Sequence, residues 1–593
     1  MSIVALSDDT SQSHIEIEDL HGLAASLNFK ITNDKDAGAY LLMLRSFESV
    51  MQHVEKAPDY IHPSLAPQDV LGGQTREYHK PDPSDNPMNA WSHCCNLAAA
   101  RPTSDLLKGR SVVIKDSISV GGLPTTLGTH PEILSKDGEL PVSPIDATVV
   151  SRLLGAGAVI KGTSTCENFC ASPLSWTSAS GPVHHPLLQG YTAGGSSSGS
   201  CALVAANALV AVGGEDGNDS YESFGPTVEL AIGTDQAGSV RNPACYTGLY
   251  GLKPTFGLVP YTGAASMSPM IDHLGPIASS LEDVAVLLKV MAGWDGLDPR
   301  MTPESPTVDR VPDYPALLAS YRASLLKQSD DTEPVLKVGL LTEAFSVSGL
   351  SPEVAELIKQ TTHEAFATAG NASVTTISVP MHTEGPVIWT AATRPSMSQW
   401  LSQGRPSGHL SYLAPHIAPQ WPPDQRMYEL LNVSNPALVN IHLSGALASS
   451  AHDSRGCMSG LEAKAHRKVF ELRAAYDRAL EEVDVLVLPC TPTVSMPHPP
   501  DPDTPLGENN NGARILDRLA PAVGLTSNTC PFNVTGHPAM SVPCGTLPVF
   551  VEVSGKKKEV QMPVGMQIVG RRWDDVGVLK AAALFEAGKK RIS

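Results

Sequence analysis

Two segments rich in glycine and small hydroxyl residues carry the strongest chemical signal in this 593-residue sequence. Residues 194–200 read GGSSSGS, and residues 233–243 read GTDQAGSVRNP. Such a density of glycine is typical of a site where the backbone approaches a ligand closely or takes dihedral angles that a side chain would forbid. We therefore interpret the two segments as walls of one site.

Ser239 is the candidate nucleophile in the second segment. The segment follows a strand-like run at residues 228–232, VELAI, so its consecutive N–H groups could form a turn that points into a cavity. An oxyanion hole of this kind stabilises the charge that develops when a hydroxyl attacks a carbonyl. The four amides expected to form it are those of Gln236, Ala237, Gly238 and Ser239.

Lys115 is the candidate base, because a serine hydroxyl reacts only when a base removes its proton. It ends residues 111–115, SVVIK, which we predict to be a short buried strand. A free lysine has a pKa of about 10.4, but desolvation can lower the pKa of a lysine by several units. A neutral Lys115 could then accept a proton through an intermediate hydroxyl.

These segments resemble the sequence signature of a known family, the amidase signature hydrolases. The matching blocks occur in the family's order over roughly residues 70 to 590, a span that makes a chance match very improbable. They are Lys115-Asp116, GGSSSGS at 194–200, GTDQAGSVR at 233–241, GLYGLKPT at 248–255, PFNVTGHPA at 531–539 and PVGMQIVG at 563–570.

The resemblance implies a role for each matched residue. Ser239 matches the nucleophile that forms an acyl-enzyme, Ser196 matches a serine that the family holds in a cis peptide bond and uses as a proton bridge, and Lys115 matches the terminal base. The oxyanion hole falls on residues 236–239. We expect further substrate contacts close to the glycine pair, from Gly194, Gly195, Ser197 and Tyr191. No metal or cofactor is expected.

Two features depart from the family's pattern. Ser196 and Ser239 lie 43 residues apart, which is longer than the family usually has. We assign the surplus to an acidic, glycine-rich surface loop at residues 213–227. Where the family often has Asn-Pro before the glycine pair, this chain has HHP at residues 184–186, so the local substrate contacts can differ while the chemistry is kept.

A rival interpretation uses the same glycines differently. Residues 195–199, GSSSG, satisfy the G-x-S-x-G pattern of α/β-hydrolases, with Ser197 as nucleophile and His273 or His537 as base. That pattern must follow a hydrophobic strand directly, and LLQGYTA at residues 187–193 is too short and is interrupted by glycine. We therefore favour Ser239, expect these histidines to be structural, and interpret Asp235 and Arg241 as a supporting ion pair.

Strand and helix patterns alternate from residue 111 onwards, which predicts an α/β fold, and the resemblance implies a mixed β-sheet surrounded by helices. The run at 201–212 is apolar all round, so we predict an interior helix whose N-terminus points at Ser196 to Ser198. Residues 57–102 and 381–425 are rich in proline and without clear periodicity, so we predict loops. Further helices are expected over 34–56, 280–293, 460–482 and 576–588, and further strands over 336–341 and 485–488.

We divide the chain into an N-terminal helical extension at residues 1–70 and a catalytic domain at residues 71–593. The domain carries insertions near 213–227, 295–335 and 381–460. Scattered aromatic residues such as Trp389 and Trp400 in the last insertion are expected to pack rather than to bind substrate, although loops on a rigid scaffold are where specificity usually lies.

The composition limits the partners. A formal net charge of −19 argues against a nucleic-acid groove and against an anionic membrane surface. No run approaches 18 consecutive apolar residues, so we expect no membrane span. The start of the chain has neither the basic nor the apolar region of a signal peptide, so a cytoplasmic location is expected. The expected partner is a small-molecule amide substrate, and the chain could form a homodimer.

The resemblance implies hydrolysis of a carbon–nitrogen amide bond, with a proton relay from Ser239 through Ser196 to Lys115. Two other activities stay open: the chain could be one component of a glutamine-dependent amidotransferase, or a carbamate or ester hydrolase of the same family. The acidic balance and the long insertions fit a free-standing hydrolase better. A binding protein that has lost activity is a further alternative, against which the three intact residues argue.

Overall fold

The structure, a computed structural model, divides the chain into two compact units, Met1–His62 and Pro63–Ser593. The first unit contains α1 (Ile17–Ser26) and α2 (Asp34–Lys56), so the helix predicted at 34–56 is confirmed. Asn33 is the N-cap of α2, because its side chain accepts hydrogen bonds from the N–H groups of Lys35 and Asp36. The residues described are 13–592 apart from 74, 136, 217–223, 327–334, 369, 403–411, 413, 418, 420, 450–459, 501–514 and 554–555.

Parts of the three predicted insertions lie outside the described residues: 217–223 in the first, 327–334 in the second, and 403–411 and 450–459 in the third. The assignment of these insertions, and the placing of the catalytic domain's start at residue 71, stay predictions.

Within the described residues, twelve strands of the larger unit form one mixed sheet, as predicted. The order is β1-β2-β4-β3-β7-β9-β8-β13-β14-β12-β10-β11, and the pairs β3–β4, β3–β7, β10–β11 and β10–β12 are parallel. The strands are β1 (Tyr78–His79), β2 (Trp91–Ala98), β3 (Ser111–Lys115), β4 (Val159–Ser164), β7 (Leu230–Asp235), β8 (Tyr250–Lys253), β9 (His273–Ala278), β10 (Lys337–Leu341), β11 (Ser373–Ile377), β12 (Val485–Pro489), β13 (Ala539–Val553) and β14 (Lys556–Gly570).

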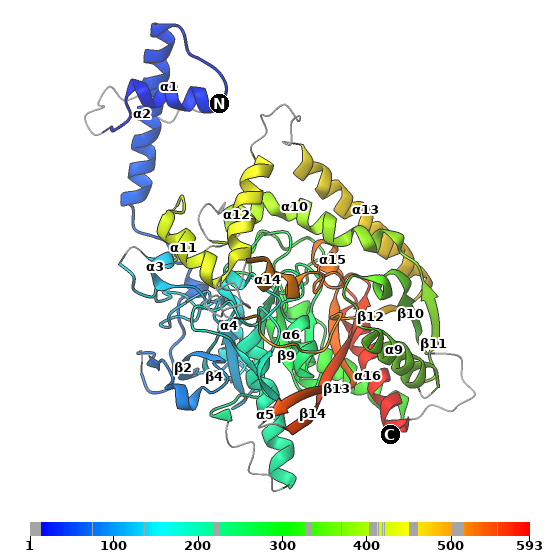
Figure 1. Cartoon of the computed structure of the whole chain (residues 1–593). Helices are drawn as coiled ribbons and strands as arrows, with labels where there is room; N and C mark the ends of the chain where they lie inside the picture. The colour runs from blue at the N-terminus through cyan, green and yellow to red at the C-terminus, as the bar shows by residue number, and fades with distance from the viewer. Residues whose placement is uncertain are drawn as a thin grey trace. The chain divides into compact units, whose positions relative to one another are not determined.

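Helices surround this sheet, and α10 packs against both α12 and α13 (Figure 1). The helices predicted at 280–293, 460–482 and 576–588 are confirmed as α7, α13 and α16. The helices of the larger unit are α3 (Pro131–Leu134), α4 (Thr148–Gly155), α5 (Ser198–Asp216), α6 (Arg241–Thr247), α7 (Leu281–Met291), α8 (Tyr314–Leu325), α9 (Pro352–Thr362), α10 (Gly385–Trp400), α11 (Gln425–Ser434), α12 (Pro436–Ser449), α13 (Leu461–Glu482), α14 (Ile515–Leu519), α15 (Pro531–Thr535) and α16 (Asp575–Ile592).

The neighbouring strands β3 and β7 bring the two chemical segments together. Successive side chains of a strand point to opposite faces of the sheet. Accordingly, Val112 and Ile114 join the core cluster that includes residues of α4 and α7, whereas Val113 joins the cluster that includes residues of α5. Because β3 and β7 are parallel, their C-terminal ends lie at one edge of the sheet. Lys115 ends β3 at this edge, and Asp235 ends β7.

The helix predicted as wholly interior is buried only in its first half. Residues 201–206 of α5 are buried, but Val210 is 40% exposed and Val212 is 63% exposed. The prediction was wrong for this second half because an apolar composition does not say where a helix leaves the core. The N-terminus of α5 does begin at Ser198, directly after Ser196 and Ser197.

Both segments predicted as loops contain regular structure. Within residues 57–102, β2 pairs with β4 and extends the sheet towards β1. Within residues 381–425, α10 runs over 16 residues with Pro395 inside it. Pro386 lies in the first turn of α10, where proline leaves no helical hydrogen bond unmade. The prolines of α10 were therefore wrongly interpreted as signs of a loop, although the helix accommodates them.

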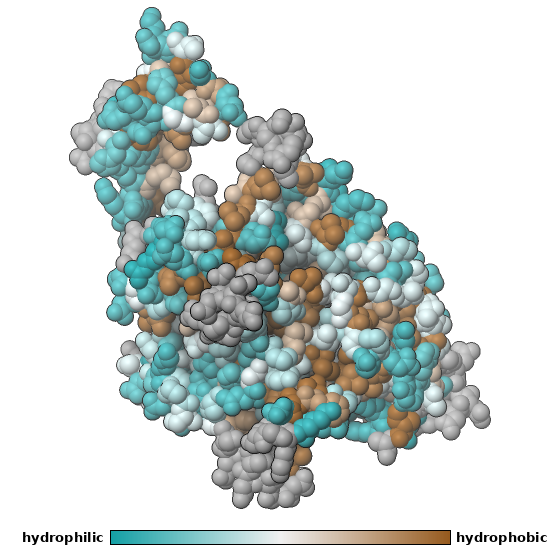
Figure 2. Space-filling view, in the orientation of Figure 1, coloured by the Kyte–Doolittle hydropathy of each residue, from teal (hydrophilic) through white to brown (hydrophobic). Residues whose placement is uncertain are grey.

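The surface of the body mixes polar and apolar residues (Figure 2). Apolar side chains gather over α12, where Leu443 is 67% exposed and Leu447 is 55% exposed. No helix in the part of the chain that the structure describes is long and apolar enough to cross a membrane.

Candidate active site

Lys115 lies fully buried at the end of β3 and contacts two hydroxyl groups. Its Nζ is 2.7 Å from Ser196 Oγ and 2.7 Å from Thr234 Oγ1. The peptide bond between Gly195 and Ser196 is cis. Nζ donates to both hydroxyl oxygens, so Lys115 joins the end of β7 to the segment that holds Ser196.

Ser239 lies next to this pair, at the turn between β7 and α6. The N–H group of Ser197 donates to the carbonyl oxygen of Ser239 at 3.2 Å, which holds the two serine segments side by side. Ser239 is 8% exposed, and its Oγ has no hydrogen-bond partner among the described residues. Lys115 and Ser196 are thus hydrogen-bonded to each other. Among the described residues, no hydrogen bond joins the side chains of Ser196 and Ser239. Catalytic hydrogen bonds are often long in unliganded sites and tighten when substrate binds.

The predicted oxyanion hole has three unpaired amides and one paired amide. The N–H group of Gly238 donates to Asp235 Oδ1 at 2.8 Å, so it is already committed. This differs from the expectation because the carboxylate of Asp235 folds back over the turn. The N–H groups of Gln236, Ala237 and Ser239 make no hydrogen bond to any described residue and stay candidates for binding an oxyanion.

A fully buried ion pair supports the turn, as the sequence suggested for Asp235 and Arg241. Two parallel hydrogen bonds of 2.9 Å join the guanidinium to the carboxylate. Burial, the largest single effect, would raise the pKa of Asp235, but the charge of Arg241 and the hydrogen bonds from Arg241 and Asn533 together outweigh it and hold that pKa well below its ordinary value. Arg241 also donates to Gln567 Oε1 at 2.6 Å and to Asn533 Oδ1 at 2.8 Å. The guanidinium thereby connects the turn to α15 and β14.

Replacing Arg241 with Met should destabilise the protein by about 3–5 kcal/mol, because it leaves the buried Asp235 carboxylate without a countercharge. The measurement is the midpoint of unfolding in urea. Lys108→Met is the control, since Lys108 and Asp105 form an ion pair at the surface, and a surface pair contributes at most about 1 kcal/mol. Equal shifts for the two variants would contradict a structural role for the buried pair.

Two buried carboxyl groups near Lys115 and Ser196, those of Glu167 and Asp116, were given no role in the sequence analysis. Glu167 accepts hydrogen bonds from Thr177 Oγ1 at 2.6 Å and from Ser198 Oγ at 2.9 Å, so it holds the start of α5. Burial raises the pKa of Glu167 to about 7. Asp116 accepts from Ser92 Oγ at 2.5 Å, and burial likewise raises its pKa to about 7. Asp116 belongs to a matched block, whereas nothing in the sequence distinguishes Glu167.

The four residues expected to contact substrate are surrounded mainly by other parts of the protein. A side chain at Gly194, where φ is +78°, would place Cβ 2.7 Å from the Cα of Pro243. At Gly195, Cβ would lie 2.5 Å from the carbonyl oxygen of Ser172. The Oγ of Ser197, which is fully buried, donates to the carbonyl oxygen of Thr234 at 3.4 Å.

Tyr191 lies in β6 (Leu188–Thr192), which pairs with β5 (His184–His185) outside the main sheet. Their contacts with substrate stay a prediction.

The geometry of the described residues gives the rival G-x-S-x-G interpretation no support. Among the described residues, no histidine makes a hydrogen bond to Ser197. His273 Nδ1 lies 2.8 Å from the carbonyl oxygen of Ile271, and His537 Nε2 lies 3.1 Å from Asp477 Oδ1. Both histidines are buried and structural, as expected.

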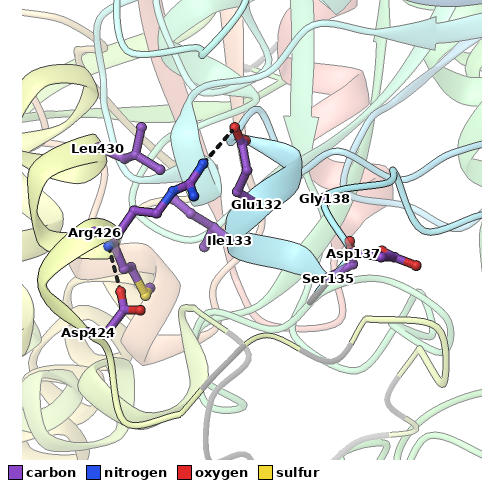
Figure 3. A pocket seen from close by; sticks show the side chains of 9 residues that line it. Glu132, Ile133, Ser135, Asp137, Gly138, Asp424, Arg426 and Leu430 are labelled. Carbon is purple, nitrogen blue, oxygen red and sulfur yellow. Dashed lines mark hydrogen bonds and ion pairs between the residues drawn. The ribbon is translucent and has the colours of Figure 1, made fainter.

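A pocket of about 360 Å³ lies apart from these residues, between α3 and α11 (Figure 3). Arg426 and Glu132 face each other across it, with Nη2 3.4 Å from Oε1. None of the predicted site residues lines this pocket. In the described part of the chain, no group of three or more His, Cys, Asp or Glu residues is arranged to hold a metal ion.

Comparison with known proteins identifies the family of this chain. A family model described as Amidase matches residues 87–221 and 226–579. An enantioselective amidase of Rhodococcus rhodochrous is 32% identical over 516 residues, which cover 86% of this chain and 85% of the relative. One component of the glutamyl-tRNA(Gln) amidotransferase of Methanosarcina barkeri is 30% identical over 488 residues, covering 81% of this chain and 84% of that relative.

Solved structures show the same fold. One of them is a bacterial aryl acylamidase that belongs to the amidase signature enzymes. It superposes with a TM-score of 0.57 over 82% of this chain and 83% of that chain, at 22% identity. A likeness at this level of identity concerns the fold alone.

Proposed function

The chain belongs to the amidase signature family, and from this premise we propose that it hydrolyses a carbon–nitrogen amide bond through an acyl-enzyme on Ser239. The observation that carries the proposal is the 2.7 Å hydrogen bond between Lys115 and Ser196, with Ser239 on the adjacent segment. A buried amine in contact with a hydroxyl next to a second, unpaired hydroxyl is the arrangement that a serine relay requires.

In the proposed first step, neutral Lys115 takes the hydroxyl proton of Ser196 while Ser196 takes that of Ser239. Ser239 Oγ then bonds to the substrate's carbonyl carbon, and the carbonyl π electrons move onto oxygen. When this tetrahedral intermediate collapses, the C–N bond breaks. The leaving nitrogen receives a proton from Ser196, which recovers one from Lys115. Water attacks the resulting ester by the same route and releases the carboxylic acid.

The amides of Gln236, Ala237 and Ser239 support the charged oxygen in both tetrahedral intermediates. Each is a fixed dipole that needs no reorganisation during the reaction, and loss of one such donor typically lowers kcat by about 10²–10³-fold. Gly194, Gly195, Ser197 and Tyr191 would border the substrate. Three expectations stay predictions. The substrate is a small-molecule amide, the chain could form a homodimer, and its location is cytoplasmic.

A second candidate function is that of one component of a glutamine-dependent amidotransferase, because one of the relatives is such a component. A carbamate or ester hydrolase is a third. The purified chain alone should be incubated with glutamine and with a panel of p-nitroanilides, carbamates, simple amides and esters. Mass spectrometry of the quenched enzyme then locates the acylated residue.

We expect the isolated chain to turn over at least one amide and to carry the acyl group on the peptide that contains Ser239. Glutamine hydrolysis alone would favour the amidotransferase, and turnover of carbamates or esters without amides would favour the third candidate. Turnover with the acyl group on another residue, or none on any compound, would overturn the proposal.

A further inference from the structure

The turn that carries Ser239 is fixed by its carbonyl groups. Five successive carbonyl oxygens, from Asp235 to Ser239, each accept a hydrogen bond, and every donor comes from outside these five residues. The donors, in order, are Asn533 Nδ2 at 2.9 Å, Trp389 Nε1 at 3.1 Å, Thr529 Oγ1 at 2.6 Å, the N–H of Asn242 at 2.7 Å and the N–H of Ser197 at 3.2 Å.

Fixing a carbonyl also fixes the next amide. A trans peptide unit is planar, so its C=O and the following N–H point in opposite directions. The bond to the carbonyl of Asp235 therefore directs the N–H of Gln236, and the bond to the carbonyl of Gln236 directs the N–H of Ala237. The bond to the carbonyl of Gly238 directs the N–H of Ser239 in the same way. These are the three amides of the turn that make no hydrogen bond to any described residue.

Trp389 differs from the other donors in its origin. It lies on α10, between the sequence blocks at 248–255 and 531–539, and it reaches the turn from a distance of 153 residues along the chain. The side chain of Gln236 is held separately, by a 2.8 Å hydrogen bond from its Nε2 to Tyr261 Oη. The Gln236 carbonyl is thus held by α10, while its side chain is held by Tyr261 of the segment between β8 and β9.

We propose that Trp389 is a positioning residue for the oxyanion hole: its indole N–H orients the Gln236–Ala237 peptide so that the N–H of Ala237 faces the developing oxyanion. The proposal rests on the proposed function and adds to it. Thr529, which precedes α15, holds the next peptide, Ala237–Gly238, whose N–H is already committed to Asp235, so it limits rotation of Ala237 from its other side. Helix α10 therefore contributes to the reaction through Trp389, besides packing against α12 and α13.

The test is Trp389→Phe, which keeps an aromatic ring and removes the N–H donor. We expect kcat on the best p-nitroanilide to fall about 5- to 50-fold, below the roughly 10²–10³-fold cost of losing a donor outright, while KM changes less than about twofold. The inhibition constant of an aryl trifluoromethyl ketone, which forms a tetrahedral oxyanion on serine, should rise by the same factor as kcat/KM falls. A loss of stability alone would not produce this match.

Trp91→Phe is the matched control. Trp91 is buried, and its Nε1 donates to the carbonyl oxygen of Pro226 at 2.9 Å, away from the turn. This variant loses the same kind of hydrogen bond and should keep the wild-type kcat. Thr529→Val and Thr529→Ser form a second pair, in which serine keeps the hydroxyl and should restore most of the activity that valine loses.

The outcomes separate this proposal from the proposed function. An active Trp389→Phe enzyme with unchanged kcat and unchanged ketone affinity would overturn the positioning role, while acylation of Ser239 would still stand. If Trp389→Phe does not fold, equal activities of Thr529→Val and Thr529→Ser would overturn the positioning role of these anchors. Absence of acylation in the wild-type protein would instead refute the proposed function.

Discussion

Ser239→Ala is expected to lower kcat by about 10⁴–10⁶-fold, because loss of a serine nucleophile leaves only binding and oxyanion stabilisation. The protein should stay folded, since Ser239 Oγ makes no hydrogen bond to any described residue and its loss leaves no buried group unpaired. The measurement is turnover of the best p-nitroanilide, together with the mass of the quenched enzyme, which should show no acyl adduct.

Ser200→Ala is the control for this variant. Ser200 belongs to the neighbouring glycine-rich segment and is fully buried, with its Oγ 2.7 Å from Ser164 Oγ. It should lose some stability through the unpaired Ser164 hydroxyl and keep its turnover. An acyl adduct on Ser239→Ala, or similar turnover for the two variants, would show that another residue is the nucleophile.

The sequence could indicate that Lys115 and Ser196 lie together, because the resemblance covers both segments, and the structure places their side chains in contact; their roles stay predictions. Lys115 ends β3 and the segment at 233–243 contains the end of β7, so this parallel pair of strands places both at one edge of the sheet. The ion pair of Asp235 with Arg241 was likewise accessible, because both residues belong to one short block. Such local patterns depend on few neighbours and need no knowledge of distant chain segments.

The role of the Gly238 amide could not be predicted in the same way. The spacing between Asp235 and Gly238 allows an aspartate side chain to accept a hydrogen bond from an N–H three residues later. The same spacing also fits a row of four free amides. Only the geometry of the turn, in which Gly238 takes a φ of +129°, distinguishes the two.

The supporting residues were missed because they come from distant parts of the chain. Glu167, Trp389 and Thr529 act through hydrogen bonds to segments many residues away, and no periodicity marks such contacts. Helix α10 was missed for a different reason, since Pro386 and Pro395 hid its pattern. Long-range packing decides whether a proline interrupts a helix or is accommodated in it.

Lys115→Met should lower kcat by at least about 10³-fold, because a methionine fills the space and can neither take nor return a proton. The variant leaves the hydroxyls of Ser196 and Thr234 without their amine partner, so a moderate loss of stability is also expected. Thermal unfolding identifies that loss and separates it from the loss of catalysis.

Lys115→Arg distinguishes a base from a fixed positive charge. Arginine stays protonated at any ordinary pH, so it places a fixed positive charge at the end of β3 and cannot accept the proton of Ser196. If Lys115 is the terminal base, Lys115→Arg should be as inactive as Lys115→Met. Recovery of more than about a tenth of wild-type turnover by arginine would assign Lys115 an electrostatic role.

A small primary amine such as methylamine should partly restore Lys115→Ala, because it can enter the space left by the side chain and accept the proton there. An absence of rescue in a variant that still binds the trifluoromethyl ketone would contradict proton transfer to this position.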